Sequence, residues 1–265
     1  MIHNAGCVID AEKIREYIRR ASGRAVRIIF YQETDSTNTR AREYARDGWD
    51  GVPTVFIAKR QSAGRGRRGR SFLSTEGGIY VSFLKMAEDE SDSPVTLTAR
   101  AAVVAAEPIE RASAVRAMIK WVNDIYINGK KVAGILAEGE FDEFGKLRHY
   151  VVGMGINVYK NSELTANVPI ATTIEDETEC DIDINGIASE IIMGFLWGVK
   201  DGVLEGYRER SFIVGQRITV HAPDGAYDAD AIAVGEDYSL VVRCDSGEIR
   251  HLNSGEVSVR AKATD

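Results

Sequence analysis

Residues 61–70 read Gln-Ser-Ala-Gly-Arg-Gly-Arg-Arg-Gly-Arg, which places four arginines and three glycines in seven consecutive positions. The whole chain has a formal net charge of −7, so this stretch is a local concentration of positive charge. Glycine permits positive φ and close backbone approach, and arginine presents a planar fork of donors that matches phosphate or carboxylate. The stretch therefore predicts a loop that closes over an anion, with a solvated basic loop as the alternative.

The same stretch contains Gly-x-Gly-x-x-Gly, the glycine spacing of a dinucleotide-binding fingerprint. That fingerprint requires the glycines to leave a strand and open a helix. Here the strand-like run 54–58 ends several residues earlier, and 71–78 lead into a second strand-like run at 78–84. The Gly-Lys-Ser/Thr ending of a P-loop is also missing from this stretch. We therefore interpret 61–70 as a loop between two strands and reject a Rossmann fold.

The rest of the chain alternates helical and β-type patterns up to about residue 208. Asp10 and Gly23 are cap residues for a first helix, and Asn128-Gly129 is a hairpin signal between the apolar stretches 117–127 and 131–140. Further helices are expected at 36–47, 95–105 (which Pro108 bends or ends) and 186–204, and further strands at 26–31 and 149–158.

After residue 208 the pattern changes to five short β-type stretches separated by Gly, Asp and Asn. Such a run is typical of a compact barrel appended to a mixed domain. The stretches are 217–220, 229–234, 239–243, 248–252 and 256–260. We therefore predict two domains, 1–208 with mixed α/β structure and 209–265 as a small β-barrel.

The composition is that of a globular protein, with 44% hydrophobic and 28% charged residues among 265. No apolar run approaches the ~20 residues that span a bilayer, and the N-terminus lacks the order of a secretion signal. Cys7, Cys180 and Cys244 are too widely spaced for a disulfide framework or a paired-cysteine zinc site. We expect a cytoplasmic protein without membrane contact. The acidic balance argues against a general nucleic-acid coat, although a local patch could bind.

Polar residues at three other places permit either a structural or a functional interpretation. Residues 33–38 lie between a strand and a helix, so Asp35 or Ser36 could cap the helix, or the hydroxyls could bind a polar uncharged group. Lys131 is either a solvated hairpin lysine or the head of a ligand-binding strand. Asp124 is either a turn residue or a hard oxygen ligand of the kind that magnesium–nucleotide sites use.

Glycines at positions 134, 153 and 155 fall within strand-like runs. A glycine weakens a strand unless a ligand or another segment packs against the bare backbone. The four histidines form no metal pattern, and no nucleophile elbow is present. If the chain is an enzyme, we therefore expect the nucleophile to belong to a substrate, and the protein to supply positioning and charge neutralisation.

Five motifs in this order closely resemble biotin–protein ligases, over residues 30 to 160. The motifs are Asp35-Ser36-Thr37-Asn38, then Gln61 with the loop Gly64 to Arg70, then Lys120-Trp121-x-Asn123-Asp124, then Lys131-x-Ala133-Gly134-Ile135-Leu136-x-Glu138, then Gly153-x-Gly155-Ile156-Asn157. The resemblance resumes at Gly255-Glu256-Val257-Ser258, which is similar to the C-terminal SH3-like barrel of that family.

The resemblance implies an α/β (α+β) catalytic domain with helices around a mixed sheet, followed by a small SH3-like β-barrel. It also implies a two-step reaction: biotin and Mg-ATP give biotinyl-5′-AMP and pyrophosphate, and a lysine of a biotin carboxyl carrier protein then takes the biotin. The expected ligands are biotin, ATP and Mg²⁺, and a homodimer is compatible with the resemblance.

The family's site residues carry over to matching positions of this chain. Biotin binding is implied for Ser36, Thr37, Asn38, Gln61, Arg65, Gly66, Arg67, Lys131 and Gly134. Adenylate binding is implied for Arg65, Arg67, Arg68, Arg70, Trp121, Asn123, Lys131 and Asn157. Catalytic roles are implied for Lys131, Arg67 and Asp124, of which Asp124 is also the expected magnesium ligand.

The chain departs from the family pattern at three packing positions. Val122 replaces a usual proline, Phe72 a usual tryptophan and Ser62 a common threonine. None of these removes a charge, so we expect activity. Residues 1–32 are too few for the DNA-binding domain of some family members, so we expect no transcriptional repression and no DNA partner.

Two rival functions remain open at this stage. One is a lipoate–protein ligase, which is a related adenylating enzyme. The other is a nucleic-acid-binding module that uses the arginine loop, which predicts a steep salt dependence of binding. The segment after residue 208 is not notably basic, and aromatic residues do not alternate with the arginines as in a stacking platform.

Overall fold

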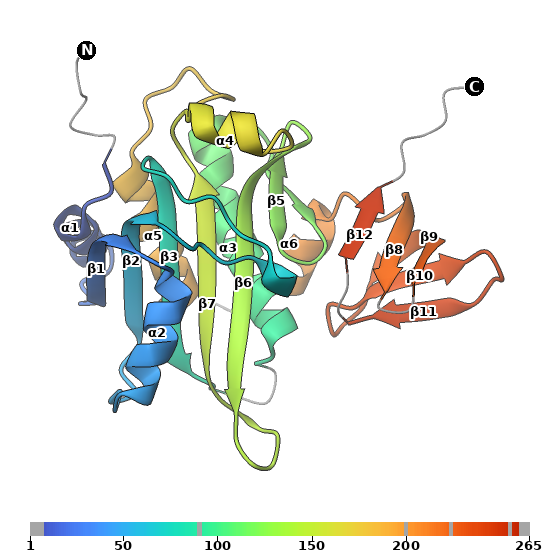
Figure 1. Ribbon diagram of the computed structural model, residues 1–265, viewed down its shortest axis with the longest axis horizontal. Helices are drawn as coiled ribbons and strands as arrows, with labels where there is room; N and C mark the ends of the chain where they lie inside the picture. The colour runs from blue at the N-terminus through green and yellow to red at the C-terminus, as the bar shows by residue number, and fades with distance from the viewer. Residues whose placement is uncertain (1–7, 89–91, 199–200, 223–224, 254–255, 260–265) are drawn as a thin grey trace.

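Two sheets make up the framework of the chain in a computed structural model, which describes residues 8–88, 92–198, 201–222, 225–253 and 256–259 (Figure 1). The first sheet has seven strands in the order β1-β2-β3-β7-β6-β5-β4. β1 and β2 pair in parallel, and the other neighbours pair antiparallel. The strands are β1 (Arg27–Thr34), β2 (Thr54–Gln61), β3 (Gly78–Met86), β4 (Met118–Lys120), β5 (Asp124–Ile127), β6 (Lys130–Phe141) and β7 (Leu147–Asn157).

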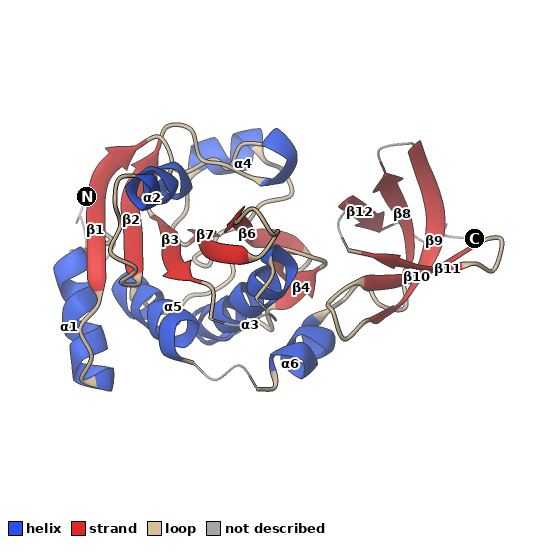
Figure 2. Cartoon of the chain, turned by 90° about the horizontal axis from the view of Figure 1, so that it is seen from below, coloured by secondary structure: helices blue, strands red, loops and turns tan. Residues whose placement is uncertain are grey.

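Helices lie on both faces of this sheet (Figure 2). Three of them cover one face: α1 (Ala11–Ser22), α3 (Pro94–Ser113) and α5 (Ile184–Trp197). On the opposite face, α2 (Thr37–Arg46) packs on β2, β3 and β7 and leaves β6 and the upper part of β7 to the loop between β2 and β3. The remaining helices are α4 (Ser162–Asn167), α6 (Val203–Arg210) and the short 3₁₀ turn η1 (Arg67–Gly69). None of the helices in the described ranges is long and apolar enough to cross a membrane.

The second sheet is antiparallel, in the order β11-β10-β9-β8-β12. Its strands are β8 (Arg217–Ala222), β9 (Gly225–Val234), β10 (Leu240–Cys244), β11 (Ile249–Leu252) and β12 (Glu256–Val259). The predicted fold class, an α/β domain on a mixed sheet followed by a small all-β unit, is confirmed. The predicted boundary between residues 208 and 209 falls within α6, and the division into two domains stays a prediction.

Two local signals in the sequence act as expected. The Asp10 side chain accepts hydrogen bonds from the amides of Glu12 and Lys13 at the start of α1, and Gly23 ends the helix at φ 68°. At the β5–β6 hairpin, Asn128 and Gly129 both have positive φ, 46° and 73°, as a type I′ turn requires.

Two expected helix limits were wrong. α3 does not end near Pro108 but continues to Ser113. Pro108 is buried, and the packing of α3 compensates for the one backbone hydrogen bond that proline cannot donate. The expected helix 186–204 is two helices, α5 and α6, separated by a segment that contains Gly198 and Gly202. Gly202 has φ 76°, which a helix cannot accommodate.

The segment from α6 to β8 holds the turn between β4 and β5 in place. The backbone amide of Phe212 donates to the carbonyl of Ile119, and the buried hydroxyl of Tyr207 donates to the carbonyl of Val122 at 3.1 Å. Trp121 Nε1 donates to the carbonyl of Tyr238, at the edge of the second sheet, at 2.9 Å. Two hydrogen bonds with the C-terminal part of the chain therefore hold the turn 121–123.

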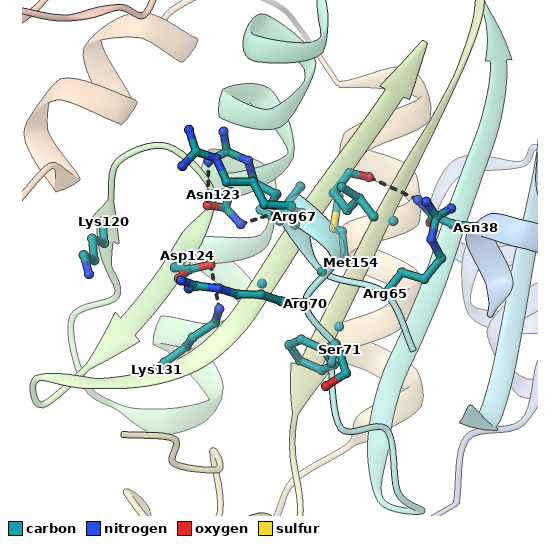
Figure 3. Close-up of a pocket in the computed structure, with 18 of the residues that line it drawn as sticks. Asn38, Arg65, Arg67, Arg70, Ser71, Lys120, Asn123, Asp124, Lys131 and Met154 are labelled. Atoms are coloured by element: carbon teal, nitrogen blue, oxygen red, sulfur yellow. Dashed lines mark hydrogen bonds and ion pairs between the residues drawn. The ribbon is translucent and has the colours of Figure 1, made fainter. Parts of the chain in front are cut away.

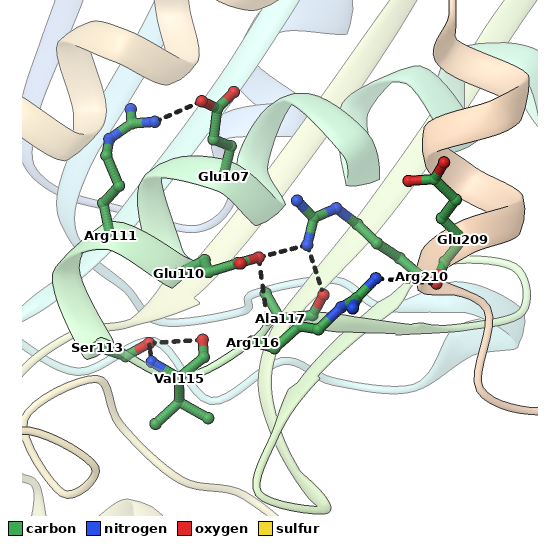
Figure 4. A network of polar contacts seen from close by, with 9 residues as sticks. All are labelled: Glu107, Glu110, Arg111, Ser113, Val115, Arg116, Ala117, Glu209 and Arg210. Carbon is green, nitrogen blue, oxygen red and sulfur yellow. Dashed lines mark hydrogen bonds and ion pairs between the residues drawn. The ribbon is translucent and has the colours of Figure 1, made fainter.

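A polar network connects the end of α3 with the end of α6 and with the residue before β4 (Figure 4). Arg210 Nη1 contacts the Glu110 carboxylate and also donates to the carbonyl of Ala117 at 3.0 Å. Burial alone would raise the pKa of Glu110, but the hydrogen bond and the charge of Arg210 outweigh it and hold the pKa below its usual value. The network therefore ties α3, the start of β4 and the end of α6 together.

We predict that Glu110→Gln lowers the free energy of unfolding by about 1 kcal/mol at pH 7, a value discounted for solvent screening of this partly exposed pair. A carboxylate with a depressed pKa stabilises the fold above its ordinary pKa of 4.5 and loses this effect as the pH falls through the folded-state value. The difference from wild type should therefore shrink below pH 4.5 in urea denaturation. Glu107→Gln, which removes an exposed pair with Arg111, is the control with little expected effect. A loss that does not change with pH would contradict this role of Glu110.

Candidate functional site

A cavity of about 370 Å³ opens on the α2 face of the first sheet, over β6 and β7 (Figure 3). The loop between β2 and β3 crosses above it (Figure 1). Segments from seven parts of the chain form its wall: 36–38, 61 and 65–72, 120–126, 131–136, 153–155, 168–170 and Val257 of β12. The sequence motifs that are far apart along the chain therefore meet at one place.

Nearly every predicted site residue lines this cavity. These are Ser36, Thr37, Asn38, Gln61, Arg65, Gly66, Arg67, Arg68, Arg70, Trp121, Asn123, Asp124, Lys131 and Gly134. Asn157 does not, because it is buried at the end of β7, where its Nδ2 donates to the carbonyl of Thr172 at 3.2 Å. In this structure Asn157 supports the segment after α4, and the predicted ligand roles of all these residues stay predictions.

The floor of the cavity is bare backbone, because Gly134 of β6 and Gly155 of β7 are directly paired. A Cβ at Gly155 would lie 2.5 Å from Cε1 of Phe72, and a Cβ at Gly153 would lie 2.0 Å from Oδ1 of Asn38. Both distances are shorter than any real Cβ contact. The glycines in these strands are therefore explained by the Phe72 ring and the Asn38 amide, which pack on the sheet where side chains would otherwise stand.

A hydrogen-bonded network fixes the start of α2 above this floor. Gln61 Oε1 accepts from the backbone amide of Thr37 at 2.7 Å and from its hydroxyl at 3.1 Å. Ser82 Oγ, from the centre of β3, lies 2.7 Å from Thr37 Oγ1 and 2.6 Å from Asn38 Oδ1. The first orphan amide of α2 is therefore satisfied by Gln61, and neither Asp35 nor Ser36 makes the expected side-chain cap to it; Asp35 instead accepts from the amide of Ser36.

Positive charge dominates the described lining of the cavity. Six cationic side chains face a single carboxylate, that of Asp124; the cations are Arg65, Arg67, Arg68, Arg70, Lys120 and Lys131. Figure 3 shows Arg67 above Asn123, whose Oδ1 accepts from Arg67 Nη1 at 3.3 Å, while Arg65 lies at the other end, towards Asn38. In a chain of net charge −7, such a concentration of positive charge favours the binding of an anion.

Lys131 is held by both its backbone and its side chain. Its amide donates to the carbonyl of Ile170 and its carbonyl accepts from the amide of Thr172, both at 2.8 Å. Its Nζ lies 2.7 Å from Asp124 Oδ1 and 3.3 Å from the place of a Cβ on Gly134. The Lys131 side chain therefore lies against the bare backbone of β6, beside the floor of the cavity.

Asp124 supplies the one carboxylate among the described residues that line this cavity. Its Oδ1 is buried and, apart from the ion-pair contact with Lys131, has no directed hydrogen bond. Burial, with a contribution from Asp124, raises the pKa of the neighbouring Tyr126 to about 12, so that phenol is neutral at pH 7. Within the described ranges no three His, Cys, Asp or Glu residues cluster as a metal site. Asp124 therefore fits magnesium only as a single protein ligand to an ion that phosphate oxygens also bind.

Several contributors to the cavity were not predicted from the sequence. Ser82 is polar in a strand whose other residues are nearly all buried and apolar, and this contrast was the available signal. The segment 168–170 and Val257 reach the cavity only through tertiary packing, which no local pattern indicates.

The part of the chain that contains the five motifs is similar to known proteins. Residues 30–157 match the family model described as the biotin/lipoate A/B protein ligase family. The chain is 29% identical over 244 residues to the bifunctional ligase/repressor BirA of Bacillus spizizenii, covering 88% of this chain and 74% of that protein. It is 29% identical over 242 residues to the biotin–[acetyl-CoA-carboxylase] ligase of Mycobacterium tuberculosis, covering 86% of each.

Solved structures agree with this match. The biotin protein ligase of Aquifex aeolicus in complex with biotin and ATP has a TM-score of 0.71 and 27% identity, over 88% of this chain and 98% of that one. The family resemblance that the five motifs indicated is thereby confirmed. Residues 30–157 of the chain are therefore a biotin/lipoate A/B protein ligase domain.

Proposed function

We propose that the chain is an ATP-dependent biotin–protein ligase. The observation that carries the proposal is the single cavity in which the polar start of α2, the bare floor of β6 and β7 and six cations converge. The names of the relatives, and the biotin and ATP in the Aquifex aeolicus structure, support it. The chemistry has two steps and takes place between substrates.

In the first step, a carboxylate oxygen of biotin attacks the α-phosphorus of ATP. The bond from that phosphorus to the bridging oxygen breaks, and pyrophosphate leaves with the electron pair. In the second step, a neutral lysine amine of the acceptor attacks the acyl carbon, AMP leaves, and the amine loses a proton. We propose a biotin carboxyl carrier protein as the acceptor.

The uncharged end of the cavity suits the ring of biotin. Ser36, Thr37, Asn38 and Gln61 supply hydroxyls and amides that are fixed by the network through Ser82. Phe72 and the backbone of Gly155 supply an apolar floor. A ureido group needs donors and acceptors without charge, and a fixed set of them binds it with little loss of entropy.

The cationic end suits the carboxylate and the phosphates. A carboxylate and a polyphosphate repel each other strongly where water is scarce, so their approach requires compensating charge. Lys131 contacts Asp124, and Arg67 contacts the adjacent Asn123. The two cations would hold the two anions together, with greater effect as charge develops in the transition state. Magnesium, when bound, neutralises the polyphosphate, and Asp124 would be its protein ligand.

Other expectations from the sequence stay predictions. They are the adenylate-binding roles of Arg65, Arg68, Arg70, Trp121 and Asn157, the absence of repressor activity and of DNA binding, a cytoplasmic location and a homodimer. The division at residue 208 also stays a proposal, supported by two separate sheets on either side of α6.

The proposed reaction predicts exchange of labelled pyrophosphate into ATP that depends on both biotin and magnesium. Lipoate in place of biotin should support little exchange, and this comparison separates the two activities that the family name covers. The absence of exchange at saturating biotin, ATP and magnesium would contradict the proposal. Tight, steeply salt-dependent binding of nucleic acid without exchange would instead favour the rival binding function.

Lys131→Ala should reduce this exchange by a factor of about 10² to 10³, the range for loss of one preorganised charge-stabilising donor. The neighbouring Lys130→Ala is a matched control, because Lys130 is exposed and does not line the cavity. Both variants should unfold at nearly the same temperature as wild type. If Lys131→Ala keeps more than about half of the wild-type exchange rate, the role assigned to Lys131 is wrong.

A further inference from the structure

The Glu138 carboxylate on β6 is the point at which the arginine loop, α2 and the sheet meet. Arg65 Nη1 lies 3.0 Å from Oε1 and 3.1 Å from Oε2 of Glu138. Arg42 Nη1 of α2 lies 3.2 Å from Oε1, and the amide Nδ2 of Asn38 donates to Oε2 at 2.9 Å. Each oxygen of one carboxylate is therefore shared between the loop and α2.

The environment of Glu138 differs from that of an ordinary surface ion pair, which contributes little. Its side chain is 21% exposed, and its partner Asn38 is buried and also hydrogen-bonded to Ser82. The carboxylate is thus held in place by the buried network, and Arg65 is the member of the group that belongs to the loop. A fixed acceptor costs less entropy to use than a free one.

The backbone of the arginine loop is bonded mainly to itself. The amide of Phe72 donates to the carbonyl of Gly64, and the amide of Gly66 donates to the carbonyl of Arg70. Side chains connect the loop to β6 and to the turn between β4 and β5, among them Arg65 on Glu138 and Arg67 on Asn123. These side-chain contacts hold the loop against the sheet in this structure.

Arg65 is also able to serve two partners at once. Its Nη1 donates to the Glu138 carboxylate, while Nε and Nη2 of Arg65 have no hydrogen bond within the described residues. Two arginines share the single charge of Glu138, so the group keeps net positive charge. An anion in the cavity can therefore bind the other edge of Arg65 without displacing Glu138.

We propose that Glu138 is a positioning residue that docks Arg65 and holds the arginine loop closed over the cavity before the substrates arrive. This inference deepens the proposed function, on which its catalytic consequence rests. A closed loop keeps water from the activated acyl phosphate, so loss of the dock should release or hydrolyse that intermediate before the acceptor arrives.

Limited digestion with trypsin tests the dock in the ligand-free full-length chain, because the loop offers cleavage after Arg65, Arg67, Arg68 and Arg70. Glu138→Gln keeps an acceptor for Asn38 but removes the charge that holds Arg65. We expect cleavage within 65–70 to become about fivefold faster, as for loss of one partly exposed ion pair when opening precedes cleavage. Cleavage outside the loop and the melting temperature should change little.

Glu140→Gln is the matched control, since Glu140 lies two residues further along β6, loses the same charge and is exposed. It should leave loop cleavage at the wild-type rate. An unchanged cleavage rate in Glu138→Gln, or an equal increase in Glu140→Gln, would overturn the inference. A melting temperature that falls together with faster cleavage at every site would show that Glu138 is only structural and would overturn it too.

A second measurement connects the dock to catalysis. With biotin, ATP and magnesium but no acceptor, Glu138→Gln should release AMP several-fold faster than wild type, while the control does not. Faster loop cleavage without any biotin-dependent AMP or pyrophosphate exchange would leave the dock supported and the proposed function wrong. Normal pyrophosphate exchange with an unchanged rate of loop cleavage would support the proposed function and refute the dock.

Discussion

The bare backbone of β6 and β7 is the constraint on which the site depends. Without side chains at Gly153 and Gly155, the Asn38 amide and the Phe72 ring reach the sheet itself. Through Asn38 the start of α2 lies against the sheet, and through Phe72 the end of the arginine loop lies against it. One methyl group at either glycine would require those side chains to move, and a packed interior tolerates such insertions poorly. The shape of the cavity therefore depends on the absence of side chains at these two glycines of β7.

The second constraint is electrostatic. The cationic side chains that line the cavity must be held in fixed positions while the cavity keeps a net positive charge. Asp124 contacts Lys131, and Glu138 contacts Arg65 and Arg42. These two carboxylates compensate part of the repulsion among the cations that line the cavity and fix the directions of their side chains. Because the cations outnumber them, the cavity still attracts anions in a chain that is acidic overall. Preorganised charge of this kind acts on the transition state without reorganisation at the moment of reaction.

Local signals in the sequence predicted most elements of the fold. Asp10 and Gly23 bound a helix, and Asn128-Gly129 makes a hairpin, because their conformations depend on nearest neighbours. The limits of α3 and α5 were missed because packing around Pro108 and the positive φ of Gly202 outweigh helical periodicity. Tertiary packing therefore overrode the local signal at Pro108, whereas Gly202 acts through its own backbone conformation.

Most residues of the site could be predicted by matching motifs to a family. The residue types alone, without that match, left structural and functional interpretations open. Gln61 as the cap of α2 could not be foreseen, because its partner Thr37 comes from another element. The resemblance implied Asn157 as an adenylate ligand, and in this structure its Nδ2 donates to the carbonyl of Thr172 in the segment after α4. Glu138 was part of a matched motif, yet its partners on α2 and the loop appear only in three dimensions.

A crystal structure of this chain with biotin and ATP would test the central claim most directly. We predict the biotin ring between the start of α2 and the glycines of β6 and β7, with its carboxylate at Lys131 and Arg67 and with Arg65 still paired to Glu138. Biotin bound elsewhere, for example in a smaller pocket that Asp10, Arg15 and Phe30 line between α1 and β1, would contradict the account. An arginine loop that takes no part in binding would contradict it too.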